Sequence, residues 1–462
     1  MSSVLASVAS VQPTNAAPLP RLFAYTTSLG LERFLDRRKR GLSTLVLSLV
    51  WLTLAWRGSG RPHHLGLLQE PLLAALRGVD RLPTAQTLHR ALAYYAAHDG
   101  RAALEAAYLA ELPRRAGRIW AALDSHHLPY WGRGQRERLR KGGSGHYRRC
   151  LRGYRLYLAV DTDTGQIITF VLLRGDARAH RLTAVLARHL RRLRGRRLAG
   201  VVADSGFTSH AAVRALLQAR IPFILGFARS ARIRARLASL TGQQRRWLRD
   251  GSAIRLGWCP WDPRLQLIAL TARTPTDDRG PWVSVTSVQG LNPGRLAALY
   301  RQRWRVEQVI DELVNGHDLD HLVSPRLHPN RSAVGLRLLA RNLALGLQIH
   351  AAGARPEVLR EPRAFRAAHV EGLGLFVQKE RTIWLRPTQP SPPRTWHVPW
   401  THRTIRLPAC GVSVRSTLAR ADGNPQIIAL ALRNRLDGDL AIRPSEERCL
   451  GHDLGANLVS EL

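Results

Sequence analysis

Apolar and polar positions change their spacing along the chain, and the change divides it into a helical part and a mixed part. Residues 21–116 favour helices, with an apolar run from Leu42 to Trp56 and helical spacing from Leu65 to Leu76. From Gly117 onwards, short apolar segments are separated by turns, which is typical of strands. The apolar run is shorter than the roughly 20 residues that a membrane span needs, so it predicts a buried helix and no membrane partner.

The segments after Gly117 follow one another as strand, strand, strand, helix, strand, helix, strand. This order indicates an α/β fold of the ribonuclease-H-like kind, a mixed sheet with helices on both faces. In such a sheet the first and fourth strands are neighbours. Asp124 lies at or near the end of the first strand and Asp204 ends the fourth, so we expect these two carboxylates to lie close together.

A third carboxylate is expected on a single helix from Tyr300 to Val314. At about 100° per residue, Tyr300, Arg303 and Glu307 fall on one stripe of that helix. The stripe suits a phosphate beside a metal-binding carboxylate, although any surface helix can show this spacing. The alternative roles of the three acids are solvated aspartates at strand ends and a glutamate on a helix surface.

The connection between the second and third acids is too long for one loop, and three strand-like segments within it predict an inserted β subdomain. The whole chain is then expected to divide into a disordered lead-in (1–20), a helical N-terminal DNA-binding domain (21–118), a catalytic core in two parts (119–231 and 295–352) around the inserted β subdomain (232–294), and a C-terminal region without an assigned role (353–462).

A polar-faced helix in the N-terminal domain is a second candidate for DNA contact. Gly78 to Pro83 reads as a turn, Thr84 is a suitable N-cap, and the helix that follows presents Gln86 and Arg90 to a groove. Together with the preceding helical segment this pattern resembles a helix-turn-helix. The alternative is an ordinary helical hairpin that touches no DNA.

The net charge of +37 narrows the class of partner to polyanions, because such a surface concentrates nucleic acid and releases counterions on binding. Ribosomal and membrane-surface proteins share this property. Nearly all the basic residues are arginines, whose planar fork suits phosphate. The four cysteines form no closely spaced pair, which argues against a zinc finger or a disulfide scaffold and agrees with a reducing cytoplasm.

Three acids of this kind suit phosphodiester chemistry, in which two magnesium ions compensate charge on the attacking and leaving oxygens. Asp124, Asp204 and Glu307 are the candidate catalytic residues and ligands for Mg²⁺, with Mn²⁺ as a possible substitute. Tyr300 and Arg303 are the candidate phosphate contacts. In the inserted subdomain, Trp258 and Trp261 either stack on bases or cap a core.

These motifs resemble the DDE transposases of bacterial and archaeal insertion sequences, in particular the IS4-like superfamily. There the third acid lies in a motif of tyrosine, two residues, arginine, three residues, glutamate, six residues and lysine. The chain has Tyr300, Arg303 and Glu307 at these spacings, with Val314 at the lysine position. The segments LDSHHLPYWG and VVADSGFTS resemble the blocks of the first and second acids, and the resemblance covers about residues 119–350.

The resemblance implies a transposase that binds double-stranded DNA with terminal inverted repeats as a homodimer or larger synaptic complex, and joins the cut ends to target DNA in the cytoplasm, at the nucleoid. It also implies that Trp258 or Trp261 holds a flipped base. With Val314 at the lysine position, either a neighbouring arginine such as Arg305 or Arg326 supplies the phosphate contact, or this copy is impaired. A metal-dependent nuclease, a domesticated transposase without strand transfer, and a non-catalytic DNA-binding protein from a decayed element are the alternatives.

Overall fold

The chain forms two compact units in the computed structural model, one of residues 1–111 with 312–455 and one built on residues 112–311. The structure describes residues 11–14, 19–35, 44–68, 82–95, 99–110, 117–133, 139–144, 149–249, 252–270, 281–351, 362–371, 374–379, 382–387, 404–407, 412–415 and 430–432. In these ranges no helix is both long and apolar enough to cross a membrane. The predicted domain boundaries stay predictions.

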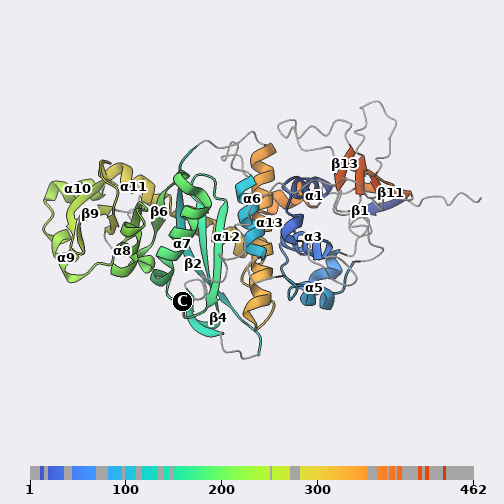
Figure 1. Cartoon of the computed structure of the whole chain (residues 1–462), viewed down its shortest axis with the longest axis horizontal. Helices are drawn as coiled ribbons and strands as arrows, with labels where there is room; N and C mark the ends of the chain where they lie inside the picture. Colours follow the sequence, from blue (N-terminus) through green and yellow to red (C-terminus); the bar gives the residue numbers. More distant parts are fainter. Residues whose placement is uncertain are drawn as a thin grey trace, which may run out of the picture. The chain divides into compact units, whose positions relative to one another are not determined.

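The second unit is built on a mixed sheet (Figure 1). Its central strands are β2 (Ile119–Pro129), β4 (Arg149–Asp161), β5 (Ile167–Arg174), β6 (Leu198–Ala203) and β7 (Phe223–Gly226). The spatial order is β5, β4, β2, β6, β7; β4 runs antiparallel to both β2 and β5, whereas β2, β6 and β7 are parallel. The predicted ribonuclease-H-like arrangement, with the first and fourth strands side by side, is therefore confirmed.

The helices between these strands form where the apolar spacing changes from two to about four. In α7 (Ala179–Arg194), Leu182, Leu186 and Leu190 recur every four residues and are fully buried. α8 (His210–Gln218) begins at an N-cap formed by Ser209, whose hydroxyl accepts a hydrogen bond from a backbone N–H. The two helices pack against each other and connect the parallel strands, as in other crossover connections.

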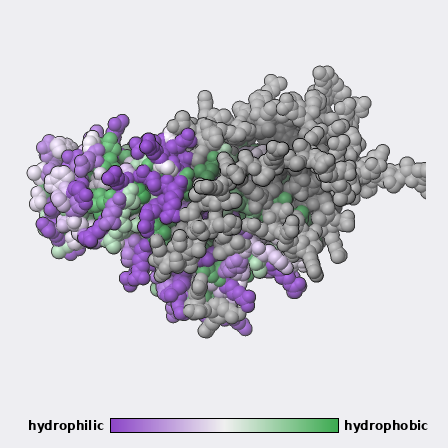
Figure 2. All heavy atoms as spheres, viewed as in Figure 1, coloured by the Kyte–Doolittle hydropathy of each residue, from purple (hydrophilic) through white to green (hydrophobic). Residues whose placement is uncertain are grey.

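The insertion between β7 and the last helices contains more than the three strands predicted from its sequence. Those strands are β8 (Ala253–Cys259), β9 (Asp262–Leu270) and β10 (Trp282–Thr286), and two helices, α9 (Ala231–Ala238) and α10 (Gly242–Arg249), precede them. β10 pairs with β7. The insertion is therefore not purely β, and its strands continue the core sheet. Hydrophilic side chains predominate on its visible face (Figure 2).

The first unit contains the buried helix expected from the apolar run. Its helices are α1 (Leu19–Ser28), α2 (Glu32–Leu35), α3 (Thr44–Trp56), η1 (Pro62–Leu68), α5 (Ala85–Ala91), α6 (Asp99–Ala110), α13 (Leu327–Ala351) and α14 (Pro362–His369). Every residue of α3 is buried, as expected for a helix with apolar residues on all sides; the hydroxyls of Ser48 and Thr53 donate to carbonyls four residues earlier in the chain. α13 falls within the predicted second part of the catalytic core (295–352), but it packs in the helical unit against α3 and α6. There Trp56 Nε1 donates to the carbonyl of Ala340 at 2.9 Å.

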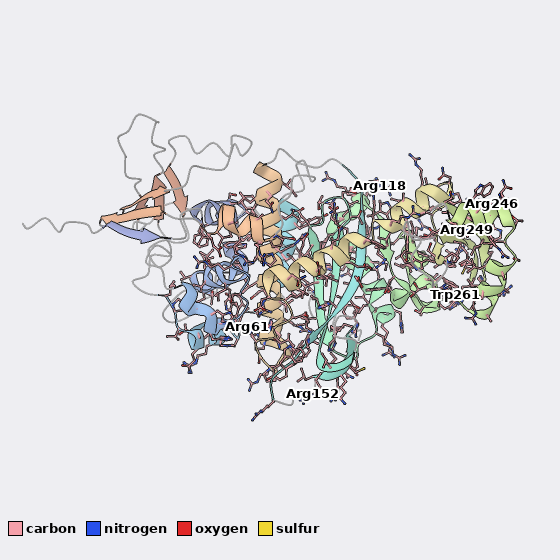
Figure 3. All side chains as sticks on the ribbon, turned by 180° about the vertical axis from the view of Figure 1, so that it is seen from behind. Arg61, Arg118, Arg152, Arg246, Arg249 and Trp261 are labelled. Carbon is pink, nitrogen blue, oxygen red and sulfur yellow. The ribbon has the colours of Figure 1, made fainter. Side chains whose placement is uncertain are left out.

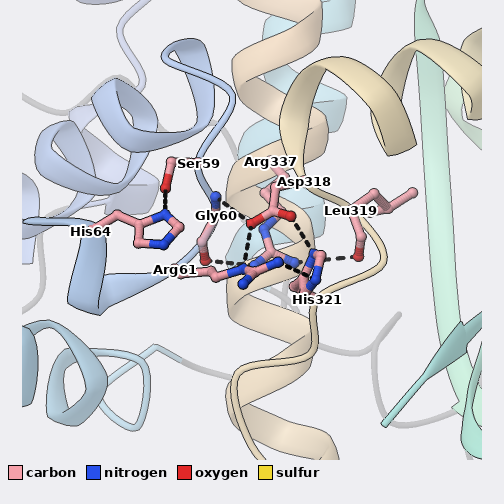
Figure 4. Close-up of polar contacts among 8 residues, drawn as sticks. All are labelled: Ser59, Gly60, Arg61, His64, Asp318, Leu319, His321 and Arg337. Atoms are coloured by element: carbon pink, nitrogen blue, oxygen red, sulfur yellow. Dashed lines mark hydrogen bonds and ion pairs between the residues drawn. The ribbon is translucent and has the colours of Figure 1, made fainter. Parts of the chain in front are cut away.

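A charged cluster connects the loop before η1 to the loop between α12 (Trp304–His317) and α13 (Figure 4). Asp318, at a left-handed φ of 56°, accepts a hydrogen bond from the Gly60 N–H at 2.9 Å and also contacts Arg61 and His321. Arg337 is 1% exposed and donates to the Gly60 carbonyl at 2.6 Å; burial lowers its pKa to about 10. Arg337 thereby has the partners that a buried charge needs, whereas the side chains of Arg61 and His321 are 36% and 37% exposed.

A second sheet corrects the prediction of a disordered lead-in at residues 1–20. This sheet contains β1 (Val11–Thr14), β11 (Gly374–Lys379), β12 (Thr382–Pro387), β13 (Thr404–Leu407), β14 (Val412–Arg415) and β15 (Leu430–Leu432). β1 pairs antiparallel with β11, so part of the expected disordered lead-in is a strand. The other five strands lie in the C-terminal region (353–462), of which residues 388–403 lie outside the described residues.

Candidate active site

The first two acids meet because of the register between β2 and β6. Leu123 pairs with Ala203 at the end of the parallel ladder. Asp124 and Asp204 each come one residue after this last pair. We expected Asp124 at or near the end of its strand; β2 instead continues to Pro129, paired with β4 alone. The end of the parallel ladder, and not the end of the strand, therefore brings the two carboxylates together.

Local hydrogen bonds hold Asp204 at the end of β6. Its carboxylate caps the short helix η4 (Ser205–Phe207) by accepting the Gly206 N–H at 3.0 Å. Thr208 Oγ1 donates to the Gly226 carbonyl at 2.6 Å, and Thr183 Oγ1 donates to the Phe207 carbonyl at 2.6 Å. The loop after Asp204 is thereby attached to both β7 and α7, which limits its freedom to move.

The predicted helix from Tyr300 to Val314 is broken in two. α11 (Pro293–Arg301) carries Tyr300, a tight turn holds Arg303, and α12 (Trp304–His317) carries Glu307 in its first turn. In the turn, the Arg303 N–H donates to the Tyr300 carbonyl at 3.0 Å, a spacing of three residues. α12 begins in the second unit, and its last residues, including Val314, belong to the first.

Arg303 links the acids electrostatically. Its Nη1 donates to Glu307 Oε1 at 2.5 Å and lies 4.0 Å from Asp124 Oδ2. The side chain of Arg303 is 11% exposed, whereas that of Glu307 is 48% exposed. Burial alone would lower the pKa of Arg303, but Glu307 and its other neighbours outweigh burial and raise it, so the guanidinium remains charged.

The positive charge of Arg303 does not offset the effect of burial on the pKa values of Asp124 and Asp204. Burial, followed by the charge of Asp204, raises the pKa of Asp124 to about 7. Burial also raises the pKa of Asp204, although Arg303 opposes this shift. Carboxylates that are desolvated and close together favour either a shared proton or a cation.

The chemistry of these donors fits a divalent metal ion, since hard cations prefer carboxylate oxygens. Among the described residues, no three of His, Cys, Asp and Glu already converge as a metal-binding group. In this arrangement Glu307 bonds to Arg303. Holding a metal with all three acids would therefore require Glu307 to leave that guanidinium.

Tyr300 is buried beside Asp204, and a glycine makes room for it. The tyrosine is 6% exposed, and burial raises the pKa of its hydroxyl. A Cβ added to Gly226 would lie 2.6 Å from the Ser205 nitrogen and 2.9 Å from the Tyr300 hydroxyl. Sequence reasoning missed Gly226, Thr208 and Thr183; a glycine within an apolar strand is the one available signal, because it marks a close backbone approach.

Gly226→Ala is expected to reduce DNA cleavage by roughly 10- to 100-fold, because a displacement of about 1 Å at a reacting group has an effect of this size. The added methyl group displaces the Asp204 loop or the Tyr300 hydroxyl. Cleavage rates and thermal unfolding would be measured side by side. Gly242→Ala is the matched control, since its Cβ meets nothing within 4 Å. A Gly226→Ala protein with the wild-type rate would show that this contact does not position the acids.

The remaining predicted DNA contacts lie at several places. Arg305 follows the turn, at the start of α12, and is half-buried. Trp258 and Trp261 are 56% and 37% exposed. Trp261 packs on Phe227 with ring centroids 4.7 Å apart, directly after the end of β7, whereas Trp258 lies in β8. Trp261, labelled in Figure 3, therefore lies beside the end of β7.

The two candidates in the N-terminal helix belong to the first unit. Gln86 and Arg90 are exposed on α5, whose N-cap Thr84 accepts the Thr87 N–H at 3.2 Å. The helix ends at Ala91 and is shorter than predicted. Residues 69–81, which include most of the preceding helical segment, lie outside the described residues, so the helix-turn-helix stays a prediction.

Comparison with known proteins identifies the segment of the chain that holds the three acids. Residues 117–343 match the family model of the transposase DDE domain, a domain that generally uses divalent metal ions. A similar solved structure is the cryo-EM structure of a piggyBac transposase synaptic complex with hairpin DNA, with 13% identity over 78% of this chain and 81% of that chain and a TM-score of 0.45. No curated protein matches the chain. Residues 117–343 are therefore identified as a transposase DDE domain.

Proposed function

We propose that the protein is the DNA transposase of an IS4-like insertion sequence, which cuts the ends of its element and joins them to target DNA in the cytoplasm. The observation that supports this most directly is the β2–β6 register, which leaves Asp124 and Asp204 adjacent at the end of a parallel ladder, with Arg303 and Glu307 beside them. The match of residues 117–343 to the transposase DDE domain supports the same reaction.

The proposed site residues are Asp124, Asp204 and Glu307 as the catalytic acids that would hold Mg²⁺, or Mn²⁺ in its place. When bound, the metal supplies charge compensation to the attacking and leaving oxygens of the phosphodiester. Arg303, freed from Glu307, pairs with a backbone phosphate, because its planar fork matches phosphate oxygens. Tyr300, buried beside Arg303, keeps the arginine in place, since the guanidinium carbon lies 5.9 Å from its ring centre.

Two displacements at phosphorus complete the reaction. Water attacks the phosphodiester at the element end, its oxygen forms the new P–O bond, and the bond to the 3′-oxygen breaks to leave a 3′-hydroxyl. That hydroxyl then attacks a phosphodiester of the target, and the target's own P–O bond breaks as the new one forms. Both displacements use the same three acids, so one site suffices for cutting and joining.

The proposed partners are double-stranded DNA with terminal inverted repeats and target DNA, bound by a homodimer in a synaptic complex. Trp261 is our candidate for stacking on a displaced base, because it is exposed and packs beside the end of β7. Gln86, Arg90 and Arg305 are further candidate DNA contacts. Val314 stands at the position of the motif lysine. Arg305 or Arg326 would make the phosphate contact in place of that lysine.

The proposal is tested with a plasmid that carries the gene and its flanking DNA, incubated with the protein in Mg²⁺ or in EDTA. We expect excision at inverted repeats and joined target product in Mg²⁺ only. Cuts without joined product would instead support a metal-dependent nuclease or a domesticated transposase without strand transfer. Binding with neither product would identify a non-catalytic DNA-binding protein.

A further inference from the structure

The hairpin formed by β3 (Arg140–Ser144) and β4 continues beyond the core sheet. The last residue of β2, Pro129, pairs with Gly153 of β4, and β3 pairs with residues 149–153. Beyond Pro129, Tyr130 still donates its N–H to the Arg152 carbonyl at 2.8 Å, and among the described residues only β3 and β4 pair as strands at this end of the unit. Figure 3 shows Arg152 on this part, at the opposite end of the sheet from Arg118, which precedes β2.

The hairpin carries like charges directly opposite each other. In its ladder Lys141 pairs with Arg152, so both side chains lie on the same face with β-carbons about 5 Å apart. Lys141 is exposed and Arg152 half-buried. The sequence contains no Asp or Glu from Arg138 to Val160, although it contains seven arginines and lysines there. Like charges opposite each other destabilise a ladder, and a two-stranded hairpin has little stability to spare.

We propose that this hairpin is a binding surface for the backbone of duplex DNA, with Lys141 and Arg152 as its phosphate contacts. A polyanion along this face converts the repulsion between the two side chains into attraction for a common partner. A two-stranded ribbon also has the width that the DNA major groove admits. The surface lies outside the group of three acids, and it rests on the proposed function only in taking DNA as the partner.

The hairpin lies at one end of the sheet, and two other arginines of the same unit, Arg196 and Arg197, lie at the opposite end. Leu198 follows the turn that contains Arg196 and Arg197 and pairs with Ile119, at the beginning of β2, whereas Gly153 pairs with Pro129, at its end. Ten residues at about 3.3 Å each separate the two ends by about 33 Å. Arg196 and Arg197 are exposed and provide a matched control with the same change in charge.

The test measures the affinity for a 30-base-pair duplex in EDTA, so that no cleavage takes place, at several salt concentrations. Lys141→Gln/Arg152→Gln is expected to flatten the slope of log affinity against log salt by about 2 and to weaken binding roughly tenfold at moderate salt. Arg196→Gln/Arg197→Gln is expected to keep the wild-type slope. An unchanged slope in the hairpin variant, with normal binding by the wild type, would overturn the inference and leave the proposed function standing.

A charge reversal separates binding from folding. Lys141→Glu places opposite charges across the ladder, so the Tm of the free protein should stay or rise by a few degrees at most, while duplex affinity falls further than in Lys141→Gln. A fall in both Tm and affinity would mean that Lys141 acts in the fold, and would overturn the inference. If the wild type bound no duplex at all, the proposed function itself would fail.

Cys150 offers an independent measurement on the same face. It lies two residues from Arg152, opposite Gly143, and is exposed, whereas Cys259 is buried. In a Cys410→Ser/Cys449→Ser background, saturating duplex should slow alkylation of Cys150 several-fold. A duplex concentration far below saturation should leave the alkylation rate unchanged. Equal alkylation rates with and without saturating duplex would contradict DNA binding at this hairpin.

Discussion

Asp124→Asn, Asp204→Asn and Glu307→Gln are each expected to lower metal-dependent DNA cleavage by about three orders of magnitude or more, because a bound metal contributes several kcal/mol to stabilising the transition state. Binding of the duplex in EDTA should change little, since the surrounding arginines remain. Rates of strand cleavage and affinities would be measured for all three variants. Asp311→Asn, an exposed carboxylate one turn beyond Glu307, is the matched control and should keep the wild-type rate.

Loss of the carboxylate at Asp124 should also stabilise the metal-free protein. Its pKa is about 7 in the folded chain and close to 3.8 when unfolded, so the folded state binds the proton more tightly. The stability linked to Asp124 is therefore present below about pH 4 and is lost as the pH rises to about 7, by at most about 4 kcal/mol. Asp124→Asn should remove most of this decline. A wild-type Tm that is flat from pH 4 to 8 would contradict the buried pair.

Gly153→Ala is expected to destabilise the protein by about 3 kcal/mol or more, because the added methyl group overlaps backbone that has no room to move. Its Cβ would lie 2.0 Å from the Leu128 carbonyl oxygen and 2.9 Å from His127 Nε2. His127 is 2% exposed, and a Cβ on Gly142 or Gly175 would also approach its ring. Denaturant unfolding in EDTA would measure the change without a contribution from metal.

Gly117→Ala serves as the control for that substitution. Gly117 precedes β2, is exposed, and a Cβ there meets nothing within 4 Å, so the change in unfolding free energy should stay within about 0.5 kcal/mol. Equal stability of the two variants would show that β4 can shift past β2 at this point. The hairpin that carries Lys141 and Arg152 would then be more loosely attached than the ladder indicates.

Local patterns along the chain were sufficient for several elements. The apolar run at 42–56 predicted a buried helix, and α3 is buried throughout because it has no polar face. The order of strands and helices after Gly117 predicted the arrangement of the core sheet, since short right-handed connections leave few alternatives. Asp204 was expected after an apolar strand and lies directly after β6.

Errors arose where a contact distant in sequence overrides the local pattern. Val11–Thr14 has little strand character of its own and becomes a strand by pairing with β11, more than 350 residues away. The amphipathic spacing from Tyr300 to Val314 continues through a turn, so periodicity alone does not show that the helix breaks after Arg301. The helices of the insertion, α9 and α10, are short and rich in arginine, and their apolar positions become evident only where Leu248 packs on Ile254 and Ala269.

The sequence by itself determined which residue types are present for the chemistry and which strands carry the first two acids. The tertiary structure decided their neighbourhood: the register that sets Leu123 against Ala203, the turn that points Arg303 at Glu307, and the absence of a side chain at Gly226 that admits Tyr300. The reason is physical. Periodicity reports which face of an element is buried, whereas register and charge balance depend on distant segments that are in contact only after folding.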